Sequence, residues 1–208
     1  KVDTVRGSIS NKTLRVVGVQ LIPMLADLPF SRKYKVAKDR YDLKFDEINL
    51  SGVDFIGLNS DGNFHAKRIN IGAAKVAVFL NRELPPPAFD KGRNYPHNAL
   101  KRLEMQTLVD TLSLDKVDIA YTEYNPKTKE RGTLRLDNLS GDILNVTNDP
   151  ARLVTKNHAY ANLTTNIMGA GKLNVKIDFN LTDKNSAFTY TGNVGAFNLN
   201  VLNPLAKS

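Results

Sequence analysis

Cysteine and tryptophan are both absent from the 208 residues of this chain. Without thiols, the chain can form neither a zinc-thiolate centre nor a disulfide, and thiol catalysis is excluded. Long apolar runs are absent as well. The longest, Leu14 to Ala26, is interrupted by Arg15, Gln20 and Pro23, whereas a membrane-spanning helix needs about 20 apolar residues. Because the sequence starts in mid-pattern, we expect a piece of a longer protein with a membrane anchor upstream.

The signatures of common catalytic and cofactor sites are also missing. The three histidines, His65, His97 and His158, are far apart and match no metal-binding spacing. No Gly-x-Ser-x-Gly elbow occurs, and residues 169–172 lead into a predicted strand, not into the helix start that cradles phosphate. The acidic residues are scattered, so no carboxylate pair can be assigned to acid-base chemistry. We therefore expect no enzymatic activity, no metal and no cofactor.

The chain is basic, with a formal charge of +8 from 29 Lys and Arg against 21 Asp and Glu. A basic surface favours anionic partners such as nucleic acids, lipid headgroups or acidic glycans. Residues 32–38 combine Arg and Lys with Tyr34, and Phe30 and Tyr41 flank them. Nucleic-acid binding uses basic residues interleaved with stacking aromatics, but a solvated loop is the simpler interpretation of so short a cluster. We expect no nucleic-acid partner.

Alternation of apolar and polar residues is what this sequence has in quantity. Five apolar side chains alternate with four polar ones from Leu173 to Leu181. Successive side chains of a strand point to opposite faces, so this segment has one apolar and one polar face. The same period recurs over most of the chain. A long two-faced sheet must cover its apolar face with another sheet, a helix or a ligand with apolar tails.

Interruptions of the alternation predict the connections. Alternation over residues 41–45 resumes out of phase at residues 48–50, which is the shift a β-bulge produces. Residues 59–62 and 125–128 carry turn signals, and residues 98–105, capped by Asn98, are the only helix candidate. The last third predicts a meander of strands over residues 159–167, 171–181, 187–191 and 196–202.

Taken together, these segments predict one mainly β domain over residues 1–208. We expect a long curved antiparallel sheet, either a β-groove or an open, taco-like sandwich, with at most one or two short helices. The proline-rich segment 85–96 is either an internal boundary or a long covering loop.

Short motifs in a fixed order extend this interpretation. The chain carries, in sequence order, Leu21-Ile22-Pro23, Ile48 to Phe55, Ala66 to Ile71, Leu108 to Leu114, Val117 to Tyr124, Met168 to Leu173, Phe188 to Gly192 and Leu202 to Leu205. This order resembles the AsmA-like proteins of the Gram-negative envelope, relatives of TamB, in their Bacteroidota form. None of the motifs is catalytic. The resemblance implies a periplasmic protein, anchored in the inner membrane, whose curved sheet conducts phospholipid between the two membranes.

The first functional hypothesis is therefore a non-enzymatic groove that binds phospholipid or another lipid by its acyl chains. The candidate groove residues are Val117, Ile119, Tyr121, Leu173, Val175, Ile177, Phe179, Leu181, Phe188 and Tyr190. Each could equally belong to a closed core. A 16-carbon chain in such a groove would gain on the order of 10 kcal/mol, at about 0.8 kcal/mol per methylene.

Two other hypotheses remain open from the sequence. The chain could be a structural or interaction module of the envelope that joins neighbouring β-units through exposed strand edges and holds no ligand. It could also be a glycan-binding or glycan-processing β-domain, if two of the scattered carboxylates meet in a cleft.

Overall fold

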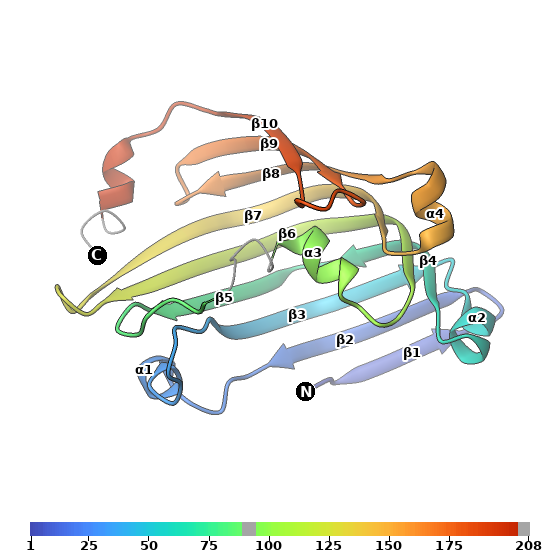
Figure 1. Cartoon of the computed structure of the whole chain (residues 1–208), viewed down its shortest axis with the longest axis horizontal. Helices are drawn as coiled ribbons and strands as arrows, with labels where there is room; N and C mark the ends of the chain where they lie inside the picture. The colour runs from blue at the N-terminus through green and yellow to red at the C-terminus, as the bar shows by residue number, and fades with distance from the viewer. Residues whose placement is uncertain (89–94, 204–208) are drawn as a thin grey trace.

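One large sheet dominates the computed structural model, which describes residues 1–88 and 95–203 (Figure 1). Strands take up 54% of the chain and helices 14%, which confirms the mainly β prediction. The strands are β1 (Thr4–Ser8), β2 (Thr13–Leu21), β3 (Arg40–Ser51), β4 (Phe64–Ile71), β5 (Ala74–Asn81), β6 (Thr107–Asn125), β7 (Glu130–Thr147), β8 (His158–Ile167), β9 (Gly171–Asn180) and β10 (Phe188–Val194).

Strand order follows the sequence from one edge, β1, to the other, β10. β4 and β5 share one position between β3 and β6, because each pairs with a different half of both neighbours. All neighbouring strands are antiparallel except β6, which runs parallel to β4 and β5. A parallel pair needs a long crossover, and residues 82–106 supply it. Figure 1 shows one described part of this connection, the helix α3 (Pro96–Lys101), in front of the sheet.

Four short helices connect the strands, where the sequence predicted at most two. They are α1 (Asp27–Ser31), α2 (Phe55–Ser60), α3 (Pro96–Lys101) and α4 (Pro150–Thr155), with a 3-10 turn, η2 (Leu199–Leu202). The side chains of Asp54 and Asp149 accept backbone hydrogen bonds at the starts of α2 and α4, as N-cap residues do. The predicted helix at 98–105 corresponds in part to α3, which begins at Pro96 and ends at Lys101, and its N-cap residue is Tyr95, not the predicted Asn98.

A line of irregular positions crosses the sheet from β2 to β7. Gly18 in β2, Lys116 in β6 and Asn138 in β7 all have positive φ, and the register shifts around the last two. Between them, Gly72 and residue 73 separate β4 from β5. At each position the apolar alternation resumes one residue out of phase, as the sequence predicted for β3. The aligned irregularities keep the apolar residues in step across neighbouring strands.

Other predicted connections had mixed outcomes. The turn at residues 125–128 joins β6 and β7 as expected. Residues 59–62 do not form a tight hairpin, because Asn59 and Ser60 end α2 and only Gly62 adopts the expected positive φ. The predicted strand at 196–202 is wrong, since its second half is η2. Residues 89–94 of the proline-rich segment lie outside the described residues.

The core is small for a chain of this length. Among the described residues, the buried apolar side chains are Leu50, Val53, Ala66, Ala74, Phe79, Val109, Val117, Ala159, Ala161 and Leu181. A single sheet layer offers one face to a core, and here only short helices and loops pack against that face. The core therefore consists of small local clusters along the sheet.

Candidate apolar binding face

The strand register shows how the apolar side of the sheet is assembled. Directly opposed residues of neighbouring strands share a face, so rows can be followed from strand to strand. One row crosses the whole sheet through Gly7, Leu14, Leu50, Ile69, Leu112, Ile143, Ala161, Ile177 and Tyr190. The next row on that side is Val5, Val16, Ile48, Ile71, Leu114, Gly141, Leu163, Val175 and Gly192. We call these two rows, with the apolar residues that continue them along each strand, the apolar face.

The row between these two points to the opposite side and is polar in every strand. It contains Arg6, Arg15, Asn49, Asn70, Ser113, Asp142, Asn162, Lys176 and Thr191. We call the side that carries it the polar face. The sheet is thus amphipathic across its whole width, which is the arrangement that the alternation in the sequence predicted.

At the β1–β4 side, the protein covers its own apolar face. Leu50, Val53 and Ala66 form a buried cluster, and Phe55 and Phe64 pack against it. Val53 is only 1% exposed. Most of this end of the apolar face is therefore closed core, whereas Val5 in the edge strand is 60% exposed.

At the β9–β10 side, the cover comes from α3. His97 is 3% exposed, and its ring centroid lies 5.1 Å from that of Phe179 and 5.9 Å from that of Phe188. Its Nε2 lies 3.1 Å from the carbonyl oxygen of Ser186, to which it donates. Tyr95 completes the ring cluster, 5.5 Å from Phe188. The described residues of the crossover thus reach the apolar face through the rings of Tyr95 and His97.

The ten predicted groove residues differ in exposure. Val117 and Leu181 are 5% and 3% exposed, so the protein itself buries them, whereas Phe188 and Tyr190 are 38% and 71% exposed. The other six are partly exposed: Ile119, Tyr121, Leu173, Val175, Ile177 and Phe179.

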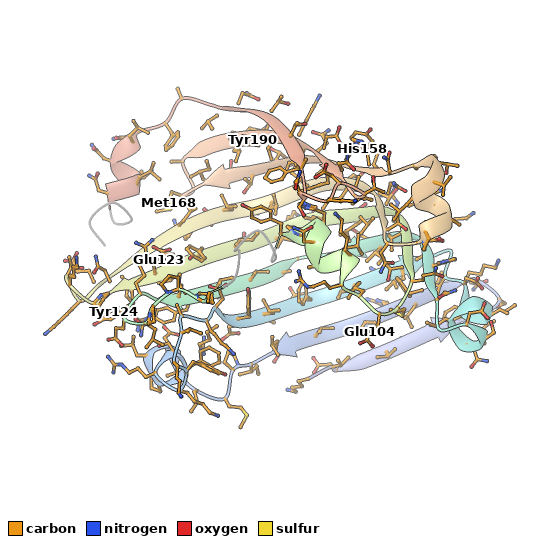
Figure 2. The ribbon with its side chains drawn as sticks, in the orientation of Figure 1. Glu104, Glu123, Tyr124, His158, Met168 and Tyr190 are labelled. Carbon is orange, nitrogen blue, oxygen red and sulfur yellow. The ribbon has the colours of Figure 1, made fainter. Side chains whose placement is uncertain are left out.

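The structure divides these residues into two groups. Phe179 is opposite Phe188 and Ile177 is opposite Tyr190 in the β9–β10 pair, so the β9 and β10 candidates form one continuous surface. The β6 candidates lie beyond the line of irregular positions. Figure 2 places Tyr190 near the upper edge of the sheet and Glu123, the hydrogen-bond partner of Tyr121, toward the left of the view.

Tyr121 has a specific polar partner. Its hydroxyl donates to Glu123 at 2.9 Å, and Glu123 also pairs with Arg82. Burial raises the pKa of the Tyr121 phenol, and the hydrogen bond to Glu123 raises it further. The phenol thus stays protonated, and its ring presents an apolar edge with its polar end already satisfied.

Two hollows lie on the polar face, and the sequence analysis identified neither. The first, of about 430 Å³, is lined by arginines and by hydroxyl and amide side chains of β1–β4. The second, of about 370 Å³, lies over β7–β10 and includes Asp142, Tyr160, Lys176 and Asp178. These residues are far apart in sequence, and only the strand register brings them together. His158, which is labelled in Figure 2, pairs with Asp178 beside the second hollow.

Within the described residues, no three His, Cys, Asp or Glu side chains are grouped so that they could hold a metal ion. The three histidines lie in separate surroundings: His65 lies 3.7 Å from Asp149, His97 is a buried residue of α3, and His158 pairs with Asp178.

The basic segment 32–38 follows α1, and two of its charged residues, Arg32 and Lys38, have local partners. Arg32 pairs with Glu83 at 2.7 Å, and the Lys38 ammonium lies 4.4 Å from the Tyr34 ring centroid. Phe30 stacks edge-on against Tyr34 at 5.2 Å. The aromatic rings of this cluster contact each other and Lys38, as a packed surface loop would.

Comparisons with known proteins add no family assignment: no protein-family model matches the chain, and no curated protein matches it. None of the helices in the described part of the chain is long and apolar enough to cross a membrane.

Proposed function

We propose that this chain is a non-enzymatic segment of an AsmA-like envelope protein and that its apolar face binds the acyl chains of phospholipid or another lipid. The proposal places the protein in the periplasm, where lipid would move along the sheet between the inner and outer membranes. The observation that supports it best is the pair of apolar rows, which continues through every strand position of a one-layer sheet.

The size of the exposed surface supports this proposal. The chain exposes 12767 Å², whereas a compact protein of 23.1 kDa exposes roughly 9,700 Å². The difference is typical of a sheet that lacks a second layer. Leaving apolar surface in water costs about 25 cal/mol per Å², so a hydrocarbon ligand on this face would lower the free energy of the folded protein.

The dimensions of the face also suit an acyl chain. Nine strand positions, spaced about 4.8 Å apart, give rows of about 38 Å. Because the buried cluster of Leu50, Val53 and Ala66 closes most of the β1–β4 end, the part of the rows open to a ligand spans the five positions β6–β10, or about 19 Å. An acyl chain spans about 15 Å, which is half of the hydrocarbon core of a bilayer, so it would fit within this open part.

A charge placed on the apolar face tests the proposal. Tyr190→Asp changes an exposed residue of the β9–β10 surface, so the variant should fold. We expect lipid that co-purifies with the chain, detected by native mass spectrometry, to be lost from this variant and from Ile177→Asp. Asn174→Asp is the matched control, because it puts the same charge on the polar side of β9. Equal lipid occupancy in all folded variants would overturn the proposal.

A second candidate function is supported by the edge strand β10. All seven of its residues are exposed, and it contains no charge and no proline. Unprotected edges of this kind pair with other strands, so β10 is suited to join a neighbouring β-unit without any ligand. Thr189→Lys together with Thr191→Lys would protect the edge. Association that disappears in this variant, measured by light scattering, with no lipid bound to the parent chain, would favour this function over lipid binding.

A further inference from the structure

The hollow on the polar face of β1–β4 has a charge arrangement that folding alone does not explain. Arg6, Arg15 and Arg68 line this hollow of about 430 Å³. No carboxylate of the described residues lines it, and its other polar lining groups include the hydroxyls of Ser8 and Ser51.

Arg6 and Arg15 are directly opposite each other in the β1–β2 pair. Like charges in this position destabilise a sheet. Arg15 is paired with Glu47, but Arg6 has no carboxylate partner among the described residues. Glu47 therefore compensates the charge of Arg15 but not that of Arg6, which lies on the edge strand β1.

Arg68 is the third cation, and it retains free donor capacity. One of its nitrogens donates to Ser113 and lies 3.6 Å from Asp142. A guanidinium has five N–H donors, and the Arg15 and Arg68 side chains are 51% and 50% exposed. The three guanidinium groups are thus balanced by only two carboxylates, those of Glu47 and Asp142, and neither of these lines the hollow.

We propose that this hollow binds a phosphate monoester. Planar guanidiniums bind phosphate oxygens with paired, charge-assisted hydrogen bonds, and a dianion would remove the repulsion between Arg6 and Arg15. The hydroxyls and amides beside the arginines supply donors for the polar group that carries the phosphate. This inference goes beyond the lipid proposal, because the hollow lies on the opposite face of the sheet.

Titration with inorganic phosphate at constant ionic strength, followed by backbone amide NMR shifts, tests the site. We expect saturable shifts confined to β1–β4. Arg6→Gln removes a charged hydrogen-bond donor and should weaken binding about tenfold. Lys127→Gln is the matched control, since it removes the same charge from the exposed β6–β7 turn. Shifts spread over the whole basic surface, or equal losses in both variants, would overturn the proposal.

Thermal unfolding gives a second readout that a merely structural role would not produce. Without phosphate, Arg6→Gln should unfold at a higher temperature than the parent chain, because the like-charge pair is gone. Phosphate should stabilise the parent chain more than it stabilises Arg6→Gln at the same phosphate concentration. Stabilisation of both proteins by the same amount would contradict the assignment.

Two ligand sources share this chemistry, a lipid headgroup and a free phosphate monoester. Vesicles containing phosphatidic acid separate them: sedimentation of the parent chain but not of Arg6→Gln assigns the phosphate to a headgroup, and inorganic phosphate binding without sedimentation assigns it to a free ester. Binding of neither overturns the proposal. Tyr190→Asp should leave phosphate binding intact, so the lipid proposal and this one can fail separately.

Discussion

The side chain of Asn81 is fully buried and joins α1 to the end of β5. Its amide nitrogen lies 2.9 Å from both the Ser31 hydroxyl, in α1, and a carboxylate oxygen of Glu83. Glu83 also accepts two hydrogen bonds from Arg32. A buried amide that makes such bonds stabilises one arrangement of the loops it connects, because losing a partner leaves it unsatisfied.

The Glu83 carboxyl makes the stability of the folded protein depend on pH in a predictable direction. Hydrogen bonds from Arg32, then from Asn81, lower the pKa of the Glu83 carboxyl from 4.5 to about 2. A lowered pKa in the folded state stabilises the protein above pH 4.5, and this stabilisation disappears as the pH falls toward about 2. Glu83→Gln should therefore be less stable than the parent chain near neutral pH, with the gap closing between pH 4.5 and about 2. Urea unfolding across this range measures it, and a gap independent of pH would contradict it.

Gly141 is a residue at which only glycine fits. Its φ is +137°, and a Cβ there would collide with the carbonyl oxygen of Asn162 in β8. Gly141→Ala should cost at least about 2 kcal/mol of unfolding free energy, from the strained backbone and the clash together. Gly62→Ala is the control, because its φ is also positive, at +69°, but nothing lies within 4 Å. It should cost about 1 kcal/mol, and equal losses in urea unfolding would show that the clash is relieved.

At the scale of strands and helices, the irregular positions keep the apolar face continuous. The backbone N–H of Lys116 donates to the Ser140 hydroxyl at 3.1 Å, and that of Asn138 donates to the Asp118 carboxylate at 2.9 Å. Backbone donors freed by the irregular ladder are thus paired with side chains of the neighbouring strand. These two hydrogen bonds therefore stabilise the bulges in β6 and β7.

Deleting Lys116 tests the role of the bulge in β6. Removing one residue shifts the side-chain period, so either the apolar residues after position 116 turn to the polar face or the register with β5 and β7 breaks. We expect loss of cooperative unfolding and of near-UV circular dichroism. Deleting Lys127, in the exposed β6–β7 turn, removes the same residue type without changing strand phase, and this variant should stay folded. A folded and cooperative Lys116 deletion would show that the bulge is dispensable.

The alternation in the sequence was sufficient to predict the strands, but not how they pair. The phase shift between residues 45 and 48 and the strand over 173–181 could be predicted because side-chain period is a local property. The parallel pairing of β6 could not, since it depends on contacts between distant segments. Helices of five or six residues, such as α1 and α4, are too short to show a helical period. The Asp149–Pro150 start of α4 was readable as a helix start, but the sequence analysis took residues 98–105 as the only helix candidate.

The candidate site was partly predictable for the same reason. The apolar side of β9 and the residues Phe188 and Tyr190 of β10 follow from the sequence pattern, and the register adds that Phe188 lies opposite Phe179 and Tyr190 opposite Ile177. Which residues stay exposed depends on contacts between segments that are distant in the sequence, so the burial of Val117 and Leu181 was not predictable. The arginine hollow needs residues from β1, β2 and β4, and no local pattern connects them.

For the whole molecule, the main consequence of the fold is that its two faces have separate properties. The apolar face is closed at the β1–β4 side by Val53 and its neighbours and is exposed at β10. The polar face carries the arginine hollow at its β1–β4 side. A ligand with an acyl chain and one with a phosphate would therefore occupy different places on the sheet.

Photo-crosslinking with a diazirine-bearing palmitic acid tests the central claim most directly, because it reports where a hydrocarbon chain lies. We expect labelled peptides from β8 to β10 that carry the label on the apolar face, at positions such as Ile177, Phe188 and Tyr190, with labelling suppressed by excess phospholipid. Labelling confined to the polar face, or none above the level of a denatured control, would contradict the claim that the apolar face binds lipid.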